Sequence, residues 1–423
     1  MKLTKRWPSV VLVGVWALLA VGCGTGDKKG EADVPAVVEV VPEETRSGEC
    51  VPCFYCGEEC VDGECVFTAC DSRQCGDDGC GGDCGTCTHG KTCFLNRCME
   101  PGCVGRQCGP DGKGGSCGEC SPSNTCNNEY GVCVAEDNVV VKGATFNMGG
   151  FEGEMCIDHL SLLNHPVTLT RALLVGVHEV TVGDWQRATG IQAPNYFGPG
   201  GMESVCGTED CPVNWLDFYD ALFFCNAQSR KLGLPECYTF TDCQGEPGTG
   251  CGEKTSCEIP FSCKVVFSGL DCLGVRLPTE AEWEYLAKGG KAVAWSWPVP
   301  DGTQKEENCV SCGEETGLME HGWYCFNGDA RTHRVGEMEP GAFGLHDMAG
   351  NVAEWVWDYY SPYGDALYFD PKGPNVGEMR VVRGGAFLDQ ARHCASTYRN
   401  RLPPVYGARH IGFRVVRSIF PAQ

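Results

Sequence analysis

Cysteine is the residue that most restricts how this chain can fold, because 33 of its 423 residues are cysteine. Residues 49–134 hold 18 of them, among very few large apolar side chains. Such a segment cannot bury a core of its own and has to be held together by cross-links. Disulfides form and persist in oxidising compartments. The sequence therefore predicts an exported chain with a small disulfide-rich region at residues 49–134.

The cysteine-rich region contains an internal repeat with a spacing of 33 residues. The string RQCGDDGCGGDCGTC is followed by the similar string RQCGPDGKGGSCGEC. The repeated cysteines are Cys75, Cys84, Cys87 and Cys93, which recur as Cys108, Cys117, Cys120 and Cys126. Cys-x-x-Cys pairs can hold zinc, but in an exported chain we interpret them as disulfide cysteines. The sequence leaves their connectivity open.

The N-terminus indicates where the chain is sent. A positively charged start precedes the apolar run Val10–Val21, which is too short for a stable membrane span and suits a signal-peptide core. Small residues then precede Cys23, a pattern similar to the lipid-attachment sequence of bacterial lipoproteins. We expect a signal peptide at residues 1–22, lipid on Cys23 and a flexible tether over residues 23–48. The alternative is a plain signal peptide, with Cys23 in a disulfide.

These features predict a lipoprotein of the bacterial cell envelope, at the outer membrane or the cell surface, with the lipid as its membrane anchor. The formal net charge of −23 argues against nucleic-acid binding, which needs clustered Lys and Arg. The partners we expect are an extracytoplasmic protein or peptide, or a carbohydrate.

The composition changes at about residue 135, where aromatic residues and amphipathic patterns begin, and residues 135–423 are long enough for one large domain. The patterns predict a helix over residues 182–189, a second helix that starts near Phe218, and a third that starts after Thr279 with Glu282 completing a capping box. The motifs in this segment are GATFNMG at 143–149, HEVT at 178–181, PVNW at 212–215, RLPTEAEWEY at 276–285, FGLHDMAGNVAEW at 343–355, RGGAF at 383–387 and IGFR at 411–414.

In this order, the motifs resemble the formylglycine-generating enzyme (sulfatase-modifying factor) family. The resemblance implies an irregular α+β fold of the C-type-lectin-like type. It also implies an activity, because enzymes of the family use oxygen and copper to oxidise a sulfatase cysteine to formylglycine.

Two acids flank a Gly-Asn turn in the longest of these motifs. Carboxylate and main-chain oxygens together suit calcium, and by resemblance this stretch matches a structural calcium loop of the family. The expected calcium ligands are Asp347, Gly350, Val352 and Glu354. The alternative is a turn that carries two solvated acids.

The residues that the resemblance implies for copper binding are only partly present in this chain. By resemblance, Cys394 occupies the position of one copper-binding cysteine, Asp389 replaces the other, and Ala386 replaces an assisting serine. A carboxylate cannot stand in for a thiolate in a two-sulfur Cu(I) site without changing its affinity and redox behaviour. Cys394, His393 and Asp389 could form a mixed site for zinc or Cu(II), but the even number of cysteines in the large domain favours Cys394 in a disulfide or as an inert thiol.

These observations favour a binding or adaptor protein whose oxidase activity is lost or altered, with Cys394 and Asp389 as the candidate catalytic positions. The alternative is an active copper- and oxygen-dependent oxidase that pairs Cys394 with another cysteine, such as Cys325. A third hypothesis makes the chain a stalked envelope component whose cysteine-rich repeats do the binding.

Overall fold

A computed structural model describes the chain at residues 58–61, 64–67, 86–87, 91–94, 97–99, 103, 106–111, 113–150, 164–194, 206–248, 259–291, 311–364 and 368–420. The predicted signal peptide, the lipid site at Cys23 and the tether at residues 23–48 lie outside these residues. Within the described ranges, no helix is both long enough and apolar enough to cross a membrane.

The three main helices form where their capping residues predict them. Helix α1 (Val182–Thr189) begins after Thr181, helix α2 (Phe218–Lys231) after Asp217, and helix α3 (Glu280–Lys288) after Thr279. In each case the side chain of the capping residue accepts from the backbone N–H three residues later, and the acid at that position reaches back to the cap. These reciprocal bonds satisfy two N–H groups that would otherwise have no partner. The shorter helices among the described residues are α5 (Leu318–His321), η3 (Ala342–Gly344) and η4 (Ala391–Cys394).

The described residues of the large domain also contain short strands, which form four small sheets. The first sheet, in order, is β13 (Val275–Arg276), β19 (Val416–Ile419), β10 (Ala172–Gly176) and β7 (Asn138–Val141). The second is β17 (Asn400–Leu402), β16 (Arg380–Arg383), β14 (Ala353–Tyr359) and β18 (Ile411–Gly412). The third is β15 (Tyr368–Phe369), β9 (His165–Thr168) and β8 (Thr145–Met148), and the fourth is the hairpin β11 (Tyr238–Gln244) with β12 (Ser262–Phe267).

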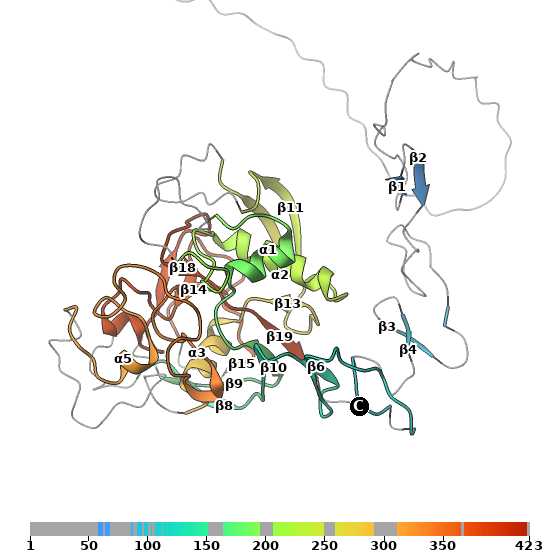
Figure 1. Cartoon of the computed structure of the whole chain (residues 1–423), viewed down its shortest axis with the longest axis horizontal. Coiled ribbons are helices and arrows are strands. Elements are labelled where there is room, and N and C mark those ends of the chain that lie inside the picture. Colours follow the sequence, from blue (N-terminus) through green and yellow to red (C-terminus); the bar gives the residue numbers. More distant parts are fainter. Residues whose placement is uncertain are drawn as a thin grey trace, which may run out of the picture.

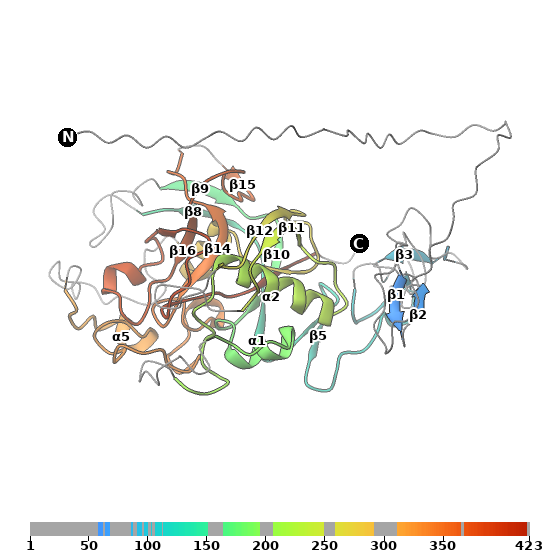
Figure 2. The ribbon, with the colours of Figure 1, turned by 90° about the horizontal axis from the view of Figure 1, so that it is seen from above.

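The core of the large domain lies on both sides of the sheet that contains β14. Trp355 on β14 packs into one apolar cluster with α1, α2 and Phe413, whereas Val356 faces a second cluster that contains Trp283 and strands β8, β9 and β10. Figures 1 and 2 both place α1 and α2 on the side of the body opposite to β8, β9 and β15. Strand β14 is thus buried on both faces, which explains its nearly continuous run of buried residues.

Helix α3 is held to β13 before it and to the C-terminal part of the chain by buried ion pairs as well as by apolar contacts. Each of its three glutamates contacts an arginine from another element, and all six side chains are almost completely buried. The pairs are Arg276 with Glu282 (2.7 Å), Arg383 with Glu284 (2.6 Å) and Arg399 with Glu280 (2.5 Å). A buried charge left without its partner is costly, so these pairs fix which strands α3 can lie against.

The second cysteine repeat is cross-linked and packs against the large domain. Its disulfides are Cys103–Cys117, Cys108–Cys126 and Cys120–Cys133. The hairpin β5 (Thr125–Asn127) with β6 (Val132–Val134) carries Tyr130 and Val132 into an apolar cluster with Ala172 and Ile419 of the first sheet. Figure 1 shows β6 beside β10 and β19.

The first repeat shares part of this connectivity. Hairpin β3 (Thr92–Phe94) with β4 (Arg97–Met99) places Cys93 opposite Cys98, as Cys126 lies opposite Cys133 in the second repeat. Cys98 is bonded to Cys87, the repeat partner of Cys120. The disulfide interpretation is therefore confirmed for Cys87, Cys117 and Cys120, whereas Cys50, Cys53, Cys56 and Cys84 lie outside the described residues. A third hairpin pairs β1 (Glu58–Val61) with β2 (Glu64–Phe67).

Candidate functional site

The residues at the copper positions lie beside a small cleft of about 130 Å³. Asp389 and His393 line this cleft, together with Tyr398. The cleft is positioned by β16, β14 and β18 and by the loop that follows the Gly384-Gly385 pair. Gly385 has a positive φ of 67°, and a Cβ atom there would lie 2.9 Å from the Cys394 sulfur. The glycine is therefore required for Cys394 to pack against this turn.

Cys394 itself is a free thiol with no exposed surface. It packs with Leu318, Tyr324 and Ala391 in a small apolar cluster and does not line the cleft. Burial, and to a smaller extent the charge of Asp389, raises the pKa of the Cys394 thiol well above its usual value. A neutral, enclosed thiol is a poor nucleophile and a poor metal ligand.

Asp389 points its carboxylate back toward its own loop. Oδ2 accepts a hydrogen bond of 3.0 Å from the backbone N–H of Ala386, and Oδ1 lies 3.5 Å from Nδ1 of His393. The other ring nitrogen of His393 accepts from Nε of Arg392 at 3.1 Å. Asp389 and His393 are thus brought together as the sequence suggested, while the sulfur of Cys394 stays buried behind them. This geometry does not assemble the mixed S/N/O metal site.

Of the two states expected for Cys394, a disulfide and an inert thiol, the structure shows the unpaired, buried thiol. Cys225 is the second free and buried cysteine in the described part of the chain, so an even count does not require full pairing. Cys325, the other cysteine suggested as a copper ligand, is bonded to Cys312. A disulfide sulfur is not a thiolate, so Cys325 cannot complete a copper site with Cys394 in this state.

The expected calcium residues lie in one buried loop, at the start of β14. Gly350 has a positive φ of 82°, and a Cβ atom there would lie 2.0 Å from the carbonyl oxygen of Trp323, so only glycine fits. Asp347 is buried, and its Oδ2 accepts a 2.7 Å hydrogen bond from the N–H of Gly336. Its Oδ1 is buried without a hydrogen-bond partner, which suits a cation ligand. Val352 is fully buried in the same loop.

The carboxylate of Glu354, unlike that of Asp347, is fully hydrogen-bonded to other side chains. Its two oxygens accept from Arg414 at 2.7 to 2.9 Å and from Nε1 of Trp283 at 2.6 Å. Four short contacts use the four lone pairs of this carboxylate. Glu354 therefore does not fit the expected calcium ligand set in this arrangement, whereas Asp347 does.

Sequence reasoning missed Glu179, which lies in the HEVT motif next to these acids. Its side chain is completely buried, and neither carboxylate oxygen has a hydrogen-bond donor. Burial, followed by the charges of Asp347 and Glu354, raises the pKa of Glu179 well above its usual value, and burial also raises that of Asp347. The signal available in the sequence was the acid within an otherwise apolar stretch, because such an acid is buried only when a proton or a positive charge compensates it.

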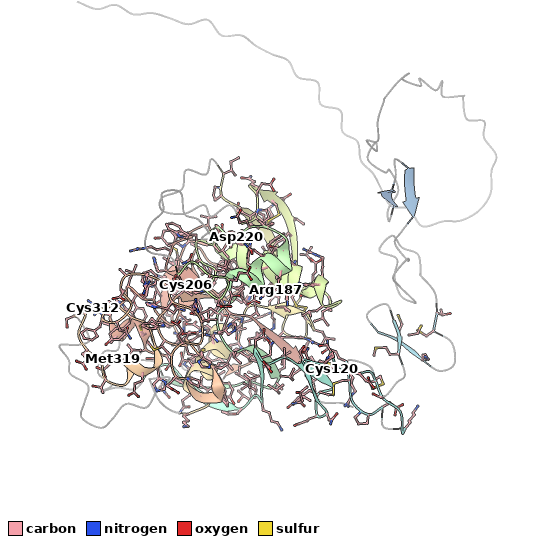
Figure 3. All side chains as sticks on the ribbon, in the orientation of Figure 1. Cys120, Arg187, Cys206, Asp220, Cys312 and Met319 are labelled. Atoms are coloured by element: carbon pink, nitrogen blue, oxygen red, sulfur yellow. A yellow bond between two sulfur atoms is a disulfide. The ribbon has the colours of Figure 1, made fainter. Side chains whose placement is uncertain are left out.

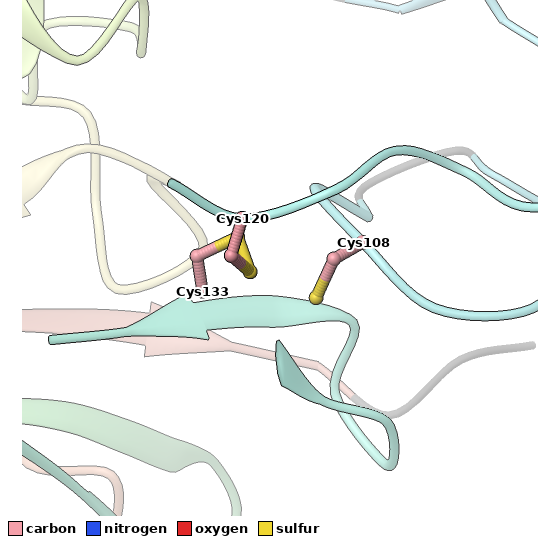
Figure 4. A group of neighbouring side chains, drawn as sticks. All are labelled: Cys108, Cys120 and Cys133. Atoms are coloured by element: carbon pink, nitrogen blue, oxygen red, sulfur yellow. A yellow bond between two sulfur atoms is a disulfide. The ribbon is translucent and has the colours of Figure 1, made fainter. Parts of the chain in front are cut away.

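Three cysteines of the second repeat lie close enough together to resemble a metal site. They are Cys108, Cys120 and Cys133, shown in Figure 4. Cys120 is bonded to Cys133 and Cys108 to Cys126, so none of the three is a thiolate that could hold a metal. Figure 3 shows Cys120 in this repeat, apart from the disulfide cysteines Cys206 and Cys312 of the large domain.

Comparison with known proteins places this geometry in a family. Residues 127–419 match the family model described as FGE-sulfatase, the sulfatase-modifying factor enzyme 1-like domain. The chaperone protein LppX of Paenibacillus barcinonensis is 27% identical over 300 residues, which cover 67% of this chain and 90% of LppX. The formylglycine-generating enzyme of Streptomyces coelicolor is 36% identical over 149 residues, covering 33% of this chain and 46% of the enzyme. The chain thus matches less than half the length of that enzyme.

A solved structure supports the same assignment. The Treponema denticola variable protein 1 superposes with a TM-score of 0.53 at 29% identity, covering 70% of this chain and 99% of that protein. The family match spans well over half of the chain and includes the cleft, the acid loop and the three capped helices. The predicted irregular α+β fold is confirmed, and the chain belongs to the sulfatase-modifying factor family.

Proposed function

We propose that this chain is an exported lipoprotein that uses its sulfatase-modifying factor domain to bind another polypeptide outside the cytoplasm, and that the domain has lost the copper oxidase reaction. The observation that carries the proposal is the state of Cys394, a completely buried thiol that does not line the cleft. Asp389 stands at the position of the second thiolate, and its carboxylate accepts a hydrogen bond from the backbone N–H of Ala386. Two thiolates that face an open cleft are what a Cu(I) site needs.

The relatives and the disulfides support the binding part of the proposal. LppX, which matches this chain over 90% of its own length, bears the name of a chaperone protein. The disulfides in both the repeat region and the large domain suit an oxidising, extracytoplasmic setting. A domain that keeps its fold but loses the reactive groups of its cleft can retain recognition without catalysis.

A copper titration of the purified full chain tests the proposal. We expect no formylglycine in a cysteine-containing sulfatase peptide after incubation with copper in air, as measured by mass spectrometry. The Streptomyces coelicolor formylglycine-generating enzyme serves as the positive control. Formation of the aldehyde by this chain would disprove the proposal.

A variant at position 389 tests whether the missing cysteine alone accounts for the loss of copper binding, or whether the surrounding structure no longer allows it. We expect Asp389→Cys to compete for Cu(I) with a chromophoric chelator more strongly than the unmodified chain, because it restores the second sulfur next to Cys394. Asp389→Ser is the control of similar size without a thiol. Equal copper affinity in all three proteins would mean that Cys394 cannot reach a ligand at position 389.

The second candidate function is an altered oxidase. It is favoured by one observation: Cys394 is still a reduced cysteine at a family copper position. Substrate binding would have to bring the sulfur of Cys394 into the cleft. Alkylation of Cys394 that appears only when a sulfatase peptide is present would favour this function.

We also propose that the domain binds calcium, with a structural and not a catalytic role. We propose that Asp347 and the main chain of the loop through Gly350 and Val352 hold calcium, with Glu354 remaining paired with Arg414. The buried Oδ1 of Asp347 supports this, since it has no other partner. A thermal transition that shifts upward with calcium relative to chelator, and no longer shifts in Asp347→Ala, would support the ion. If calcium does not change the transition of the unmodified chain, the calcium proposal is wrong. Protonation of Asp347 and Glu179 would then be what neutralises these buried acids.

The envelope location is proposed from the N-terminal sequence. We propose that Cys23 carries lipid and anchors the chain at the outer membrane or cell surface. Metabolic labelling with an alkyne fatty acid tests this: the label should be incorporated into the unmodified chain and lost in Cys23→Ser. Equal labelling of both chains would contradict lipidation at this residue.

A further inference from the structure

A second and larger cavity lies away from the copper positions. It encloses about 380 Å³ and is formed by the N-terminus of α3, the end of β14, strand β15 and the loop 371–374. Its walls are mostly aromatic and aliphatic rings, namely those of Tyr359, Tyr363, Tyr368, Pro362, Pro371 and Pro374. Such a volume with largely apolar walls and few polar groups is typical of a ligand site.

The polar groups of the cavity are positioned by the fold. Both oxygens of Glu280 accept from Arg399, at 2.5 and 2.6 Å, and the hydroxyl of Tyr363 donates to Glu280 at 3.2 Å. The guanidinium of Arg399 stacks 3.7 Å from the centre of the Tyr363 ring. Oδ2 of Asp358 accepts from the backbone N–H of Glu280 at 2.8 Å. The cavity is therefore pre-formed, and these four polar residues are already hydrogen-bonded to one another.

The buried floor of the cavity is close to electrically neutral, and the one lysine of the lining, Lys372, is exposed to solvent. The charges of Glu280 and Arg399 cancel within the protein, and both side chains are buried. Burial, followed by the charge of Glu280, raises the pKa of Asp358 to about 8, so this acid is mostly protonated at neutral pH. A charged ligand group would gain no counter-ion at the floor of this cavity and would lose its hydration. An uncharged ligand group can enter this cavity without that loss.

Exposed apolar side chains lie next to the cavity in the chain. Phe369 follows Tyr368 and is 64% exposed, and Val376 lies two residues after Pro374 and is 81% exposed. Met379 accepts a backbone hydrogen bond from Tyr360, at the end of β14, and is 36% exposed. A small polar ligand would not cover these side chains, whereas a polypeptide on either side of an inserted residue could.

We propose that this cavity binds one bulky, uncharged side chain of an extended peptide segment from another protein. The inference rests on the proposed binding function and names the chemistry of its partner. A carbohydrate is disfavoured because its hydroxyls need free acceptors, and the carboxylate oxygens of Glu280 are already used by Arg399 and Tyr363. A peptide needs only a few donors for its carbonyl groups and an apolar space for its side chain.

Fluorescence anisotropy with the full chain tests the proposal. The probes are fluorescein-labelled, end-capped peptides of Gly and Ser with a single central Phe, Leu, Lys or Glu. We expect the Phe and Leu peptides to bind about tenfold or more tightly than the Lys and Glu peptides, as expected when an apolar side chain is buried and a charge is not. Equal binding of all four peptides, or of none, would overturn the proposal.

A cavity-filling variant locates the site. Ser361 lies at the cavity and is partly exposed, so Ser361→Trp should fill the space and abolish binding of the Phe peptide. Val266→Trp is the matched control, because Val266 is 64% exposed on β12 and does not line the cavity. Circular dichroism and thermal melting show whether both variants are folded. If Ser361→Trp is folded and still binds the peptide, the site is elsewhere.

Two further outcomes separate this inference from the proposed function. Displacement of the peptide by neutral oligosaccharides would make the cavity a carbohydrate site and overturn the inference. Formylglycine formation in the copper assay would overturn the proposed function instead, whatever the peptide experiment shows.

Discussion

At the scale of single residues, burial changes the chemistry of three groups that sequence alone would treat as ordinary. Cys394 is a thiol sealed in an apolar cluster. Glu179 is an acid with no donor on either oxygen. Asp358 is an acid whose pKa burial raises to about 8. In each case desolvation disfavours the charged form, and the consequence can be measured.

The native Cys394 thiol should resist alkylation. We expect no reaction of Cys394 or Cys225 with iodoacetamide in the folded chain near pH 8, because both sulfurs are fully buried and burial raises both pKa values. Both should react after unfolding without reduction. Peptide mass spectrometry identifies the modified sites, and rapid modification of Cys394 in the native chain would show that its sulfur reaches solvent.

Asp358→Asn should stabilise the protein more as the pH rises. The folded-state pKa of about 8 lies above the ordinary value of 3.8, so the native state holds a proton that the unfolded state has lost between these values. The stability linked to this proton is complete below about pH 4 and is lost as the pH rises to about 8. Asparagine stays neutral and keeps an oxygen for the N–H of Glu280.

The difference in unfolding free energy between Asp358→Asn and the unmodified chain should therefore grow by on the order of 1.4 kcal/mol per pH unit within this window. Denaturant unfolding at pH 5, 6 and 7 — roughly the window where the linkage acts — measures it. A difference that is independent of pH would show that Asp358 is ionised in the folded state.

At the scale of elements, ion pairs and disulfides join segments that local hydrogen bonds cannot join. Cys237 and Cys272 connect the start of β11 to the segment before β13, across 35 residues of sequence. Both cysteines are buried beside α2 and the aromatic core. Cys243 and Cys263, by contrast, bridge strands β11 and β12, which are already paired by backbone hydrogen bonds.

Removal of the first of these disulfides should cost more stability than removal of the second. We expect the double variant Cys237→Ala with Cys272→Ala to lose roughly 2–5 kcal/mol of unfolding free energy, because it frees a long loop and leaves a gap in the core. The double variant Cys243→Ala with Cys263→Ala should lose less. Denaturant melts of both variants provide the comparison, and a larger loss in the hairpin variant would contradict the argument.

At the scale of the whole molecule, the second cysteine repeat is part of the large domain's packing. Tyr130 and Val132 share an apolar cluster with strands β10 and β19, and Arg417 of β19 donates to the side chain of Gln107 at 3.3 Å. The family match itself begins at residue 127, within this repeat. The predicted boundary between residues 134 and 135 thus falls just after a hairpin that the large domain covers.

The repeat and the large domain should therefore unfold together. We expect Tyr130→Ala to lower the unfolding free energy of the large domain by about 2 kcal/mol, since it removes a ring that is only 6% exposed. Phe420→Ala, next to Ile419 but 41% exposed, is the control and should have little effect. Differential scanning calorimetry checks this, and two separate transitions in the unmodified chain would mean that the repeat is an independent unit.

Short-range patterns in the sequence are enough to predict the local structure of this protein. Thr279 and Glu282 predict the start of α3, and the run from Val182 predicts α1, because capping bonds and helical periodicity act over three or four residues. The repeated cysteines likewise indicate disulfides, because cysteines in such number in a chain predicted to be exported favour disulfides over metal ligands. The motif order identified the family without any coordinates.

The chemistry of the site, by contrast, depends on contacts between segments that are far apart in the chain. Arg414 lies 60 residues after Glu354 in the chain and occupies its oxygens, so the expected calcium ligand is already paired. Cys394 is left unpaired because the cysteine that approaches its cluster, Cys325, is bonded to Cys312. Ligand sets, pKa values and thiol pairing depend on neighbours contributed by distant segments and on the loss of water around them. Those neighbours are set by packing, so no local pattern in the sequence could assign them.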